Sequence, residues 1–125
     1  MENKHLISCK KNYVEARSDG PNTLELIMNL WKKIIDACIE CTCFNILNIS
    51  NSALPVTVND AINHLKSFEH LEITTDYRIA LVELNPACSK SSLLVESILL
   101  THGMNIRTFL NIDDAKCWLF HGRKI

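Results

Sequence analysis

Two short apolar runs constrain the fold of this chain more than any other feature. They are residues 42–49, TCFNILNI, and residues 77–84, YRIALVEL. Each has the length of a strand and is mostly apolar, a pattern that suits strands covered on both faces of a sheet. Helical patterns lie between them and on either side. The two runs therefore predict parallel strands that are joined by helical crossovers.

Four segments show the spacing of three and four residues between apolar side chains that is typical of amphipathic helices. The predicted helices span residues 24–38, residues 57–68, residues 89–103 and a last segment that begins at Asp113 or Asp114. Asn22 or Thr23 can cap the first helix, Thr57 or Asn59 can cap the second, and Gly103 suits the C-terminal cap of the third. The apolar stripe of the first helix is expected to face a core.

The remaining elements complete an alternating order. Residues 5–18 contain two strand-like runs separated by the polar residues 10–12 and followed by a turn at residues 19–21, and residues 104–110 form a last strand. The order is β-β-α-β-α-β-α-β-α. We therefore expect an α/β fold with a mixed, mostly parallel sheet of about five strands, an N-terminal hairpin and four helices. The length of 125 residues indicates one domain over residues 1–125.

Charge and hydropathy exclude several classes of function. The chain has 13 Lys and Arg against 14 Asp and Glu, a net charge of -1, and the two signs are interspersed. This pattern lacks the basic face of a non-specific nucleic-acid binder. The first residues do not resemble a signal peptide, and Glu96 interrupts the apolar residues 93–100, so no membrane span is expected. We expect a cytoplasmic protein.

Half of the six cysteines lie in the stretch CIECTC, as Cys38, Cys41 and Cys43. A structural zinc site needs four converging ligands, and a second pair of ligands is missing here. A thioredoxin-like C-x-x-C begins a helix, whereas this one lies where the first helix ends. Packing as buried thiols is therefore favoured over a metal or redox role, with Cys41 and Cys43 on one face of the following strand. All six cysteines are expected to be reduced, and no metal or other cofactor is predicted.

The loop after the first apolar run, residues 50–57, is the favoured site. A loop that leads from the carboxyl end of a strand into a helix brings together backbone N–H groups and the positive end of the helix dipole, which favours an anion or a phosphorylated hydroxyl. The candidate residues for contact with a partner or for phosphorylation are Ser50, Ser52, Thr57 and Asp60. In the other interpretation Ser52 is a turn residue and Thr57 only a helix cap.

A second candidate contact for an anion or ligand lies in residues 85–92, NPACSKSS. The residues that could make it are Ser89, Lys90 and Ser91. The segment is not a P-loop, because both glycines of that motif are absent and Pro86 occupies the turn. Otherwise Ser89 is a helix cap and Lys90 is solvated.

The sequence gives little support for a pair of catalytic residues. Asp60 and His64 are four residues apart and can share a helix face, as can Cys117 and His121. Neither pair has a visible third member, and such spacing is more typical of surface pairs. We therefore predict no catalytic residue and no enzymatic activity.

The closing stretch, MNIRTFLNIDDAKCWL, carries a distinctive pattern. Arg107 and Phe109 lie in a last strand of the type xxRxF, and an acidic turn leads into A-x-x-W-L with Trp118 and Leu119. Together with the order of elements over nearly the whole chain, this stretch resembles the STAS superfamily, whose small domains include the anti-sigma-factor antagonists. The resemblance implies a non-enzymatic regulatory or ligand-sensing module.

The resemblance also implies a place for the partner. The best understood STAS domains are phosphorylated on a serine of an Asp-Ser-Ser-Gly motif at the start of the second helix, and they bind a partner kinase through this region. The chain reads NISNSALPVTVND there and lacks the motif, so it is more similar to divergent members whose role is not defined.

Two functions follow as hypotheses. The first is a protein-interaction module that acts through residues 50–57 and the second helix. The alternative is a domain that binds a small apolar or lipid-like ligand between the sheet and its helices, suggested by the apolar stretches LELIMNLWKKII and LLVESILL. A homodimer is compatible with either, because edge strands and apolar helix faces often pair.

Overall fold

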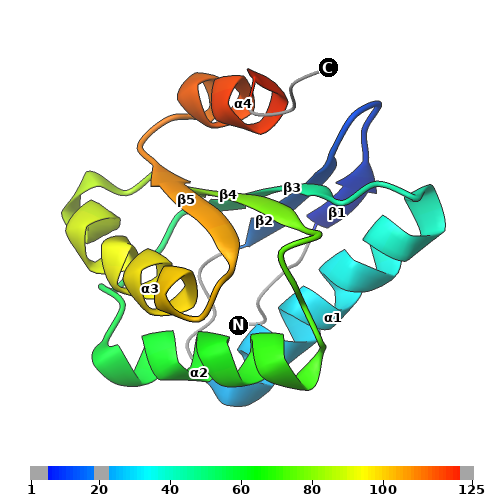
Figure 1. Ribbon diagram of the computed structural model, residues 1–125. Coiled ribbons are helices and arrows are strands. Elements are labelled where there is room, and N and C mark those ends of the chain that lie inside the picture. The colour runs from blue at the N-terminus through cyan, green and yellow to red at the C-terminus, as the bar shows by residue number, and fades with distance from the viewer. Residues whose placement is uncertain (1–5, 19–22, 122–125) are drawn as a thin grey trace.

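The computed structural model describes residues 6–18 and 23–121 and contains a five-stranded sheet (Figure 1). The strands are β1 (Leu6–Cys9), β2 (Val14–Ser18), β3 (Asn45–Ser50), β4 (Arg78–Glu83) and β5 (Asn105–Phe109). They lie in the order β1-β2-β3-β4-β5, with β1 antiparallel to β2 and the other neighbours parallel. The predicted mixed sheet with an N-terminal hairpin is confirmed.

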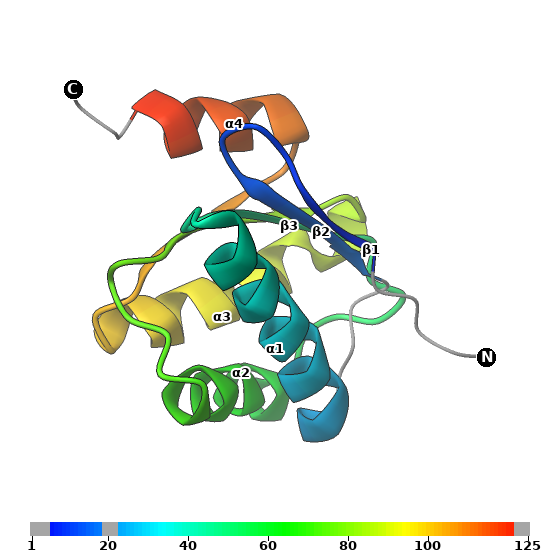
Figure 2. The same cartoon turned by 90° about the vertical axis from the view of Figure 1, so that its right-hand side faces the viewer.

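The helices cover the two faces of the sheet unequally. They are α1 (Leu24–Cys41), α2 (Val58–His70), α3 (Ser89–Thr101) and α4 (Ile112–His121), with a short 3-10 helix η1 (Pro86–Cys88) before α3. The first three helices lie on one face and α4 on the other (Figures 1 and 2). Successive crossovers of the same hand place α1, α2 and α3 on the same side. The predicted order of elements is therefore confirmed, while the turn predicted at residues 19–21 lies outside the described residues.

The position of α2 leaves room for the site between this helix and the sheet. This helix packs on α1 and α3 and lies farther from the sheet than either of them (Figures 1 and 2). Its main anchor is Phe68, which is fully buried and meets Trp31 of α1 edge-on, with ring centroids 4.7 Å apart. Side chains from several elements line the space between α2 and the strand ends.

Local sequence signals account for the ends of the helices. The side chain of Thr23 caps α1 by accepting a hydrogen bond from the backbone N–H of Leu26 at 3.2 Å. The helix continues past its predicted end at Cys38, and it stops where Thr42 adopts a left-handed conformation with φ 53°. Gly103, with φ 85°, follows the end of α3 as predicted.

The cysteines of CIECTC do not all have the predicted environment. Cys41 is the last residue of α1 rather than a strand residue, because the helix is longer than predicted. It forms a disulfide with Cys9 of β1, so the prediction that all cysteines are reduced is wrong for this pair. Cys38 is buried, whereas Cys43 is half-buried in the connection to β3. Burial and the nearby Cys43 raise the pKa of the Cys38 thiol to about 12, which keeps this thiol protonated and unreactive.

The described residues contain neither a metal-binding cluster nor a helix that could span a membrane. Over residues 6–18 and 23–121, no cluster of three or more His, Cys, Asp or Glu side chains could hold a metal ion. Within the same ranges, no helix has the length and apolar character needed to cross a membrane.

Candidate functional site

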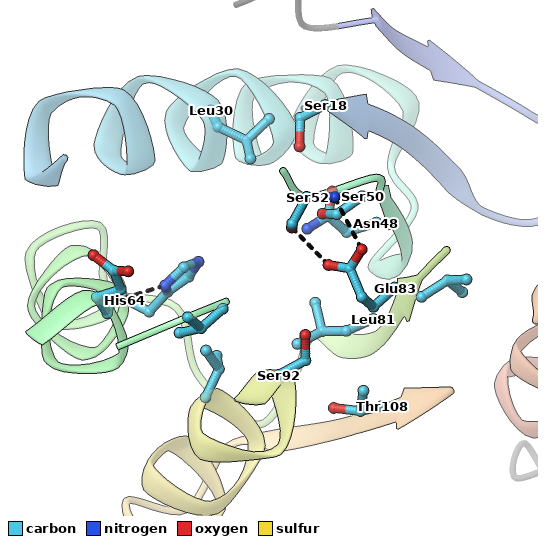
Figure 3. Close-up of a pocket in the computed structure, with 14 residues that line it drawn as sticks. Ser18, Leu30, Asn48, Ser50, Ser52, His64, Leu81, Glu83, Ser92 and Thr108 are labelled. Carbon is cyan, nitrogen blue, oxygen red and sulfur yellow. Dashed lines mark hydrogen bonds between the residues drawn. The ribbon is translucent and has the colours of Figure 1, made fainter. Parts of the chain in front are cut away.

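A partly open cavity of about 50 Å³ lies between the strand ends and α2 (Figure 3). Strand residues alternate between the two faces of the sheet, and those on the side of α1, α2 and α3 are apolar near the start of each strand. At the carboxyl ends the same faces become polar and line the cavity, as Ser18 in β2, Asn48 and Ser50 in β3, Glu83 in β4 and Thr108 in β5. The carboxyl ends of parallel strands are the usual place for ligand sites in α/β folds.

Glu83 fixes the loop that follows β3. Its side chain is only 4 % exposed. The carboxylate accepts hydrogen bonds from the backbone N–H of Ser52 at 2.9 Å and from the Ser52 hydroxyl at 2.6 Å (Figure 3). It also accepts one from the backbone N–H of Asn85 at 3.1 Å. The Asn85 amide in turn donates to the carbonyl of Ser52 at 2.7 Å. The N–H and hydroxyl of Ser52 are therefore bonded to Glu83, and its carbonyl is bonded to Asn85.

The start of α2 is closed by an internal capping box. The side chain of Thr57 accepts from the backbone N–H of Asp60 at 3.1 Å, and the Asp60 carboxylate accepts from the N–H of Thr57 at 3.0 Å. Just before it, the N–H of Val56 donates to the hydroxyl of Ser91 at 2.9 Å. These backbone donors, which could have held an anion, already have acceptors within the domain.

His64 faces the strand ends from α2 (Figure 3). Its Nδ1 lies 3.1 Å from the backbone carbonyl of Asp60. A carbonyl can only accept, so Nδ1 carries the proton of the neutral ring and Nε2 keeps a lone pair. Burial lowers the pKa of His64 below its usual value of 6.5, while the hydrogen bond to Asp60 and the charge of Asp60 oppose that shift. The ring is therefore neutral at pH 7.

Two buried polar atoms of the cavity residues have no partner. In the part of the chain that the structure describes, no hydrogen-bond partner lies near Asn48 Oδ1 or Thr108 Oγ1. Asn48 is only 5 % exposed. Buried polar atoms are nearly always paired with protein or ordered water, so these two atoms are exceptions.

The structure brings some of the predicted site residues together and separates others. Ser50, Ser52 and Asp60 all line the cavity, whereas Thr57 caps α2 from an exposed position. The second predicted group lies outside it. There the Ser89 hydroxyl donates to the carbonyl of Pro86, the Ser91 hydroxyl donates to that of Cys88, and Lys90 is exposed.

The cavity also contains polar residues that were not predicted as site residues. Among them are Asn48, His64, Glu83 and Thr108. The prediction that His64 belongs to a surface pair with Asp60 is wrong, because α2 turns both residues toward the strand ends. Two of these residues had a signal in the sequence: Asn48 is a polar amide near the end of the apolar run 42–49, and Glu83 is a carboxylate one residue before the end of the run 77–84.

Comparison with known proteins identifies the type of fold. No family model matches the chain, and no curated protein matches it. A crystal structure of an uncharacterized protein from the DUF3478 family of Shewanella loihica PV-4, described as having a SpoIIAA-like fold, superposes with a TM-score of 0.56. The match covers 95% of this chain and 96% of that one at 15% sequence identity. The fold is SpoIIAA-like.

The SpoIIAA-like fold confirms the architecture that the STAS resemblance implies, and contacts within the closing stretch account for its residue pattern. Phe109 of β5 packs on Trp118 of α4 with ring centroids 5.8 Å apart, and the Arg107 guanidinium lies 6.0 Å from the Phe109 ring. From the neighbouring strand, the Arg78 guanidinium stacks 3.8 Å over Trp118. The xxRxF strand and the W-L helix therefore belong to one cluster that attaches α4 to the sheet.

The neutral state of the half-buried His64 predicts a pH dependence of stability. In the unfolded chain His64 takes up a proton near pH 6.5, whereas in the folded chain the ring is protonated only at a lower pH. The contribution of His64 to the free energy of unfolding is therefore fully present above pH 6.5 and is lost as the pH falls toward the pKa of the folded state. The loss cannot exceed about 1.4 kcal/mol per pH unit. Urea unfolding from about pH 7.5 to about pH 5.5 should show a smaller loss in His64→Gln than in the wild type.

His102 supplies the matched control. Its Nδ1 also lies near the carbonyl four residues earlier, at 2.9 Å from Ile98, but its side chain is exposed. His102→Gln should therefore keep the pH dependence of the wild type. Equal pH profiles for His64→Gln and the wild type would contradict the neutral state of His64.

Proposed function

We propose that the domain is a non-catalytic regulatory module that binds a protein partner through residues 50–57 and the outer face of α2. One observation carries the proposal. A loop fixed from inside by Glu83 exposes Leu54 at 64 %, and Val58 and Ile62 continue along α2 at 59 % and 37 % exposure. We call Leu54, Val58 and Ile62 the outer stripe. Exposed apolar residues grouped in this way are typical of protein contact sites.

The fixed loop supports this proposal energetically. A partner that binds a loop already held in place does not have to order it, so less of the contact energy is lost on association. In this proposal Ser50, Ser52, Thr57 and Asp60 shape the contact surface, and the outer stripe makes the contact. The Ser52 hydroxyl lies beside the Glu83 carboxylate, where a phosphate would meet a like charge. The proposed contact is therefore independent of phosphorylation at Ser52.

Two further expectations from the sequence belong to the proposal. A cytoplasmic location fits a regulatory module, and in a reducing compartment the exposed Cys9 leaves its disulfide with Cys41 open to thiol exchange. Binding of an apolar or lipid-like ligand has less support. The cavity has a volume of about 50 Å³, whereas pockets for such ligands are roughly 300–1,000 Å³.

The test compares two single substitutions in capture experiments from the cell that makes the protein. Val58→Asp places a charge on the outer stripe in the first turn of α2. A negative charge at this end of a helix interacts favourably with the helix dipole, so the variant is expected to fold. Leu93→Asp makes the same change at a 47 % exposed position of α3. Quantitative mass spectrometry should show the partner reduced roughly tenfold for Val58→Asp and unchanged for Leu93→Asp. Equal capture by both variants would contradict the proposal.

A further inference from the structure

The cavity beneath α2 is lined by acceptors that lack donors. Asn48 Oδ1 is buried and has no partner among the described residues. Across the cavity, His64 Nε2 carries a lone pair because Nδ1 donates to the carbonyl of Asp60. A molecule that fits here must therefore bring N–H or O–H donors.

The charge of the cavity selects among such molecules. The carboxylates of Asp60 and Glu83 belong to its lining and are 9 % and 4 % exposed. None of the described residues that line the cavity is Lys or Arg. Both carboxylates accept hydrogen bonds from neutral N–H or O–H groups, but no cation among the described residues forms an ion pair with either of them. A cation is therefore the ligand that best matches their charge. An anion would meet two like charges.

The remaining lining defines the size and the rest of the ligand. Leu30, Val56 and Val95 provide an apolar wall next to the polar strand ends. A volume of about 50 Å³ admits one ammonium group with a short alkyl chain, and the opening of the cavity lets a longer chain leave toward solvent. An ammonium group offers three N–H donors, which suits acceptors on several sides.

We propose that this cavity binds a small primary alkylammonium ion, with Asn48 Oδ1 and His64 Nε2 accepting its N–H groups and Asp60 and Glu83 supplying the opposite charge. The proposal goes beyond the partner surface, because the ligand lies on the inner side of α2 and the outer stripe on the other. It gives both unpaired acceptors a donor and provides the buried carboxylates with a counter-ion. Either site can exist without the other.

The test is an NMR titration of the full chain at neutral pH and constant ionic strength. Ethylammonium chloride is the probe, ethanol is the neutral control of the same number of heavy atoms, and sodium acetate is the anionic control. A ligand of three heavy atoms binds with a dissociation constant of about 1 mM at best, so the titration should extend to about 30 mM. We expect saturable shifts of the Asn48 side-chain amide and the His64 ring with ethylammonium alone.

Two outcomes of the titration overturn the proposal. The first is the absence of saturable shifts with ethylammonium, which would mean that the cavity holds only water. The second is an equal response to ethanol or acetate, which would mean that the positive charge is not recognised.

Matched variants separate binding from folding. Asn48→Leu keeps the approximate shape and removes an unpaired buried polar group, so the domain should fold while its affinity for ethylammonium falls roughly tenfold. Asn59→Leu, at an exposed position of α2, should keep the wild-type affinity within about twofold. If Asn48→Leu does not fold, His64→Phe and its control His102→Phe repeat the comparison. Unchanged affinity in a folded cavity variant would contradict the proposal.

Discussion

Glu83→Ala should lower the free energy of unfolding by about 3 kcal/mol, because it removes the acceptor of three hydrogen bonds in a buried place. The backbone N–H groups of Ser52 and Asn85 and the Ser52 hydroxyl would all lose their partner. Urea unfolding followed by circular dichroism measures the change. The same variant should weaken partner capture, since the loop that begins the outer stripe is no longer fixed from inside.

Two controls define what this result means. Glu69→Ala removes an exposed carboxylate of α2 and should change the unfolding free energy by no more than about 0.5 kcal/mol. Glu83→Gln keeps one acceptor oxygen and should lie between the wild type and Glu83→Ala. If Glu83→Ala proved as stable as Glu69→Ala, the carboxylate would not hold the loop.

Phe68→Ala should lower the free energy of unfolding by about 4 kcal/mol, a large part of the stability of a domain of this size. The ring is fully buried and is the main contact of α2 with Trp31 of α1. Because α2 lies farther from the sheet than the other two helices, it is held mainly by its packing on α1 and α3. Urea unfolding gives the magnitude, and hydrogen exchange should show α2 opening before the strands.

Phe44→Ala is the matched control for this substitution. Phe44 also forms an edge-on aromatic pair, with Tyr77 at 5.1 Å, but its side chain is 42 % exposed. The expected loss there is about 1 kcal/mol. Equal losses for the two variants would show that Phe68 does not anchor α2.

The order of elements could be predicted because it depends on local signals. Apolar runs of strand length and helical spacing identify the sheet and its helices, and the caps at Thr23 and Thr57 are visible in sequence. The end of α1 could not be placed, because Thr42 has no side-chain signal for its left-handed conformation. The Cys9–Cys41 disulfide joins residues 32 positions apart and depends on the packing of α1 against β1.

The candidate site was predicted only in part for a similar reason. The rule that ligands bind at the carboxyl ends of strands pointed to Ser50 and Ser52. The role of Glu83 depends on the pairing that places it opposite Ser50 in the neighbouring strand, which no local pattern reveals. The burial of His64 depends on which face of α2 turns inward, and helical spacing alone did not decide it. The missed residues are thus the ones whose positions depend on strand register and on the orientation of a helix, which the sequence alone does not show.

The most direct test of the partner surface is site-specific photo-crosslinking in the cell that makes the protein. A photoreactive phenylalanine replaces Ile62 on the outer stripe of α2, and the same residue replaces Leu93 on α3 as the control. The proposed function predicts a discrete cross-linked protein at position 62 and none at position 93. Cross-links of equal yield at both positions, or none at position 62, would contradict it.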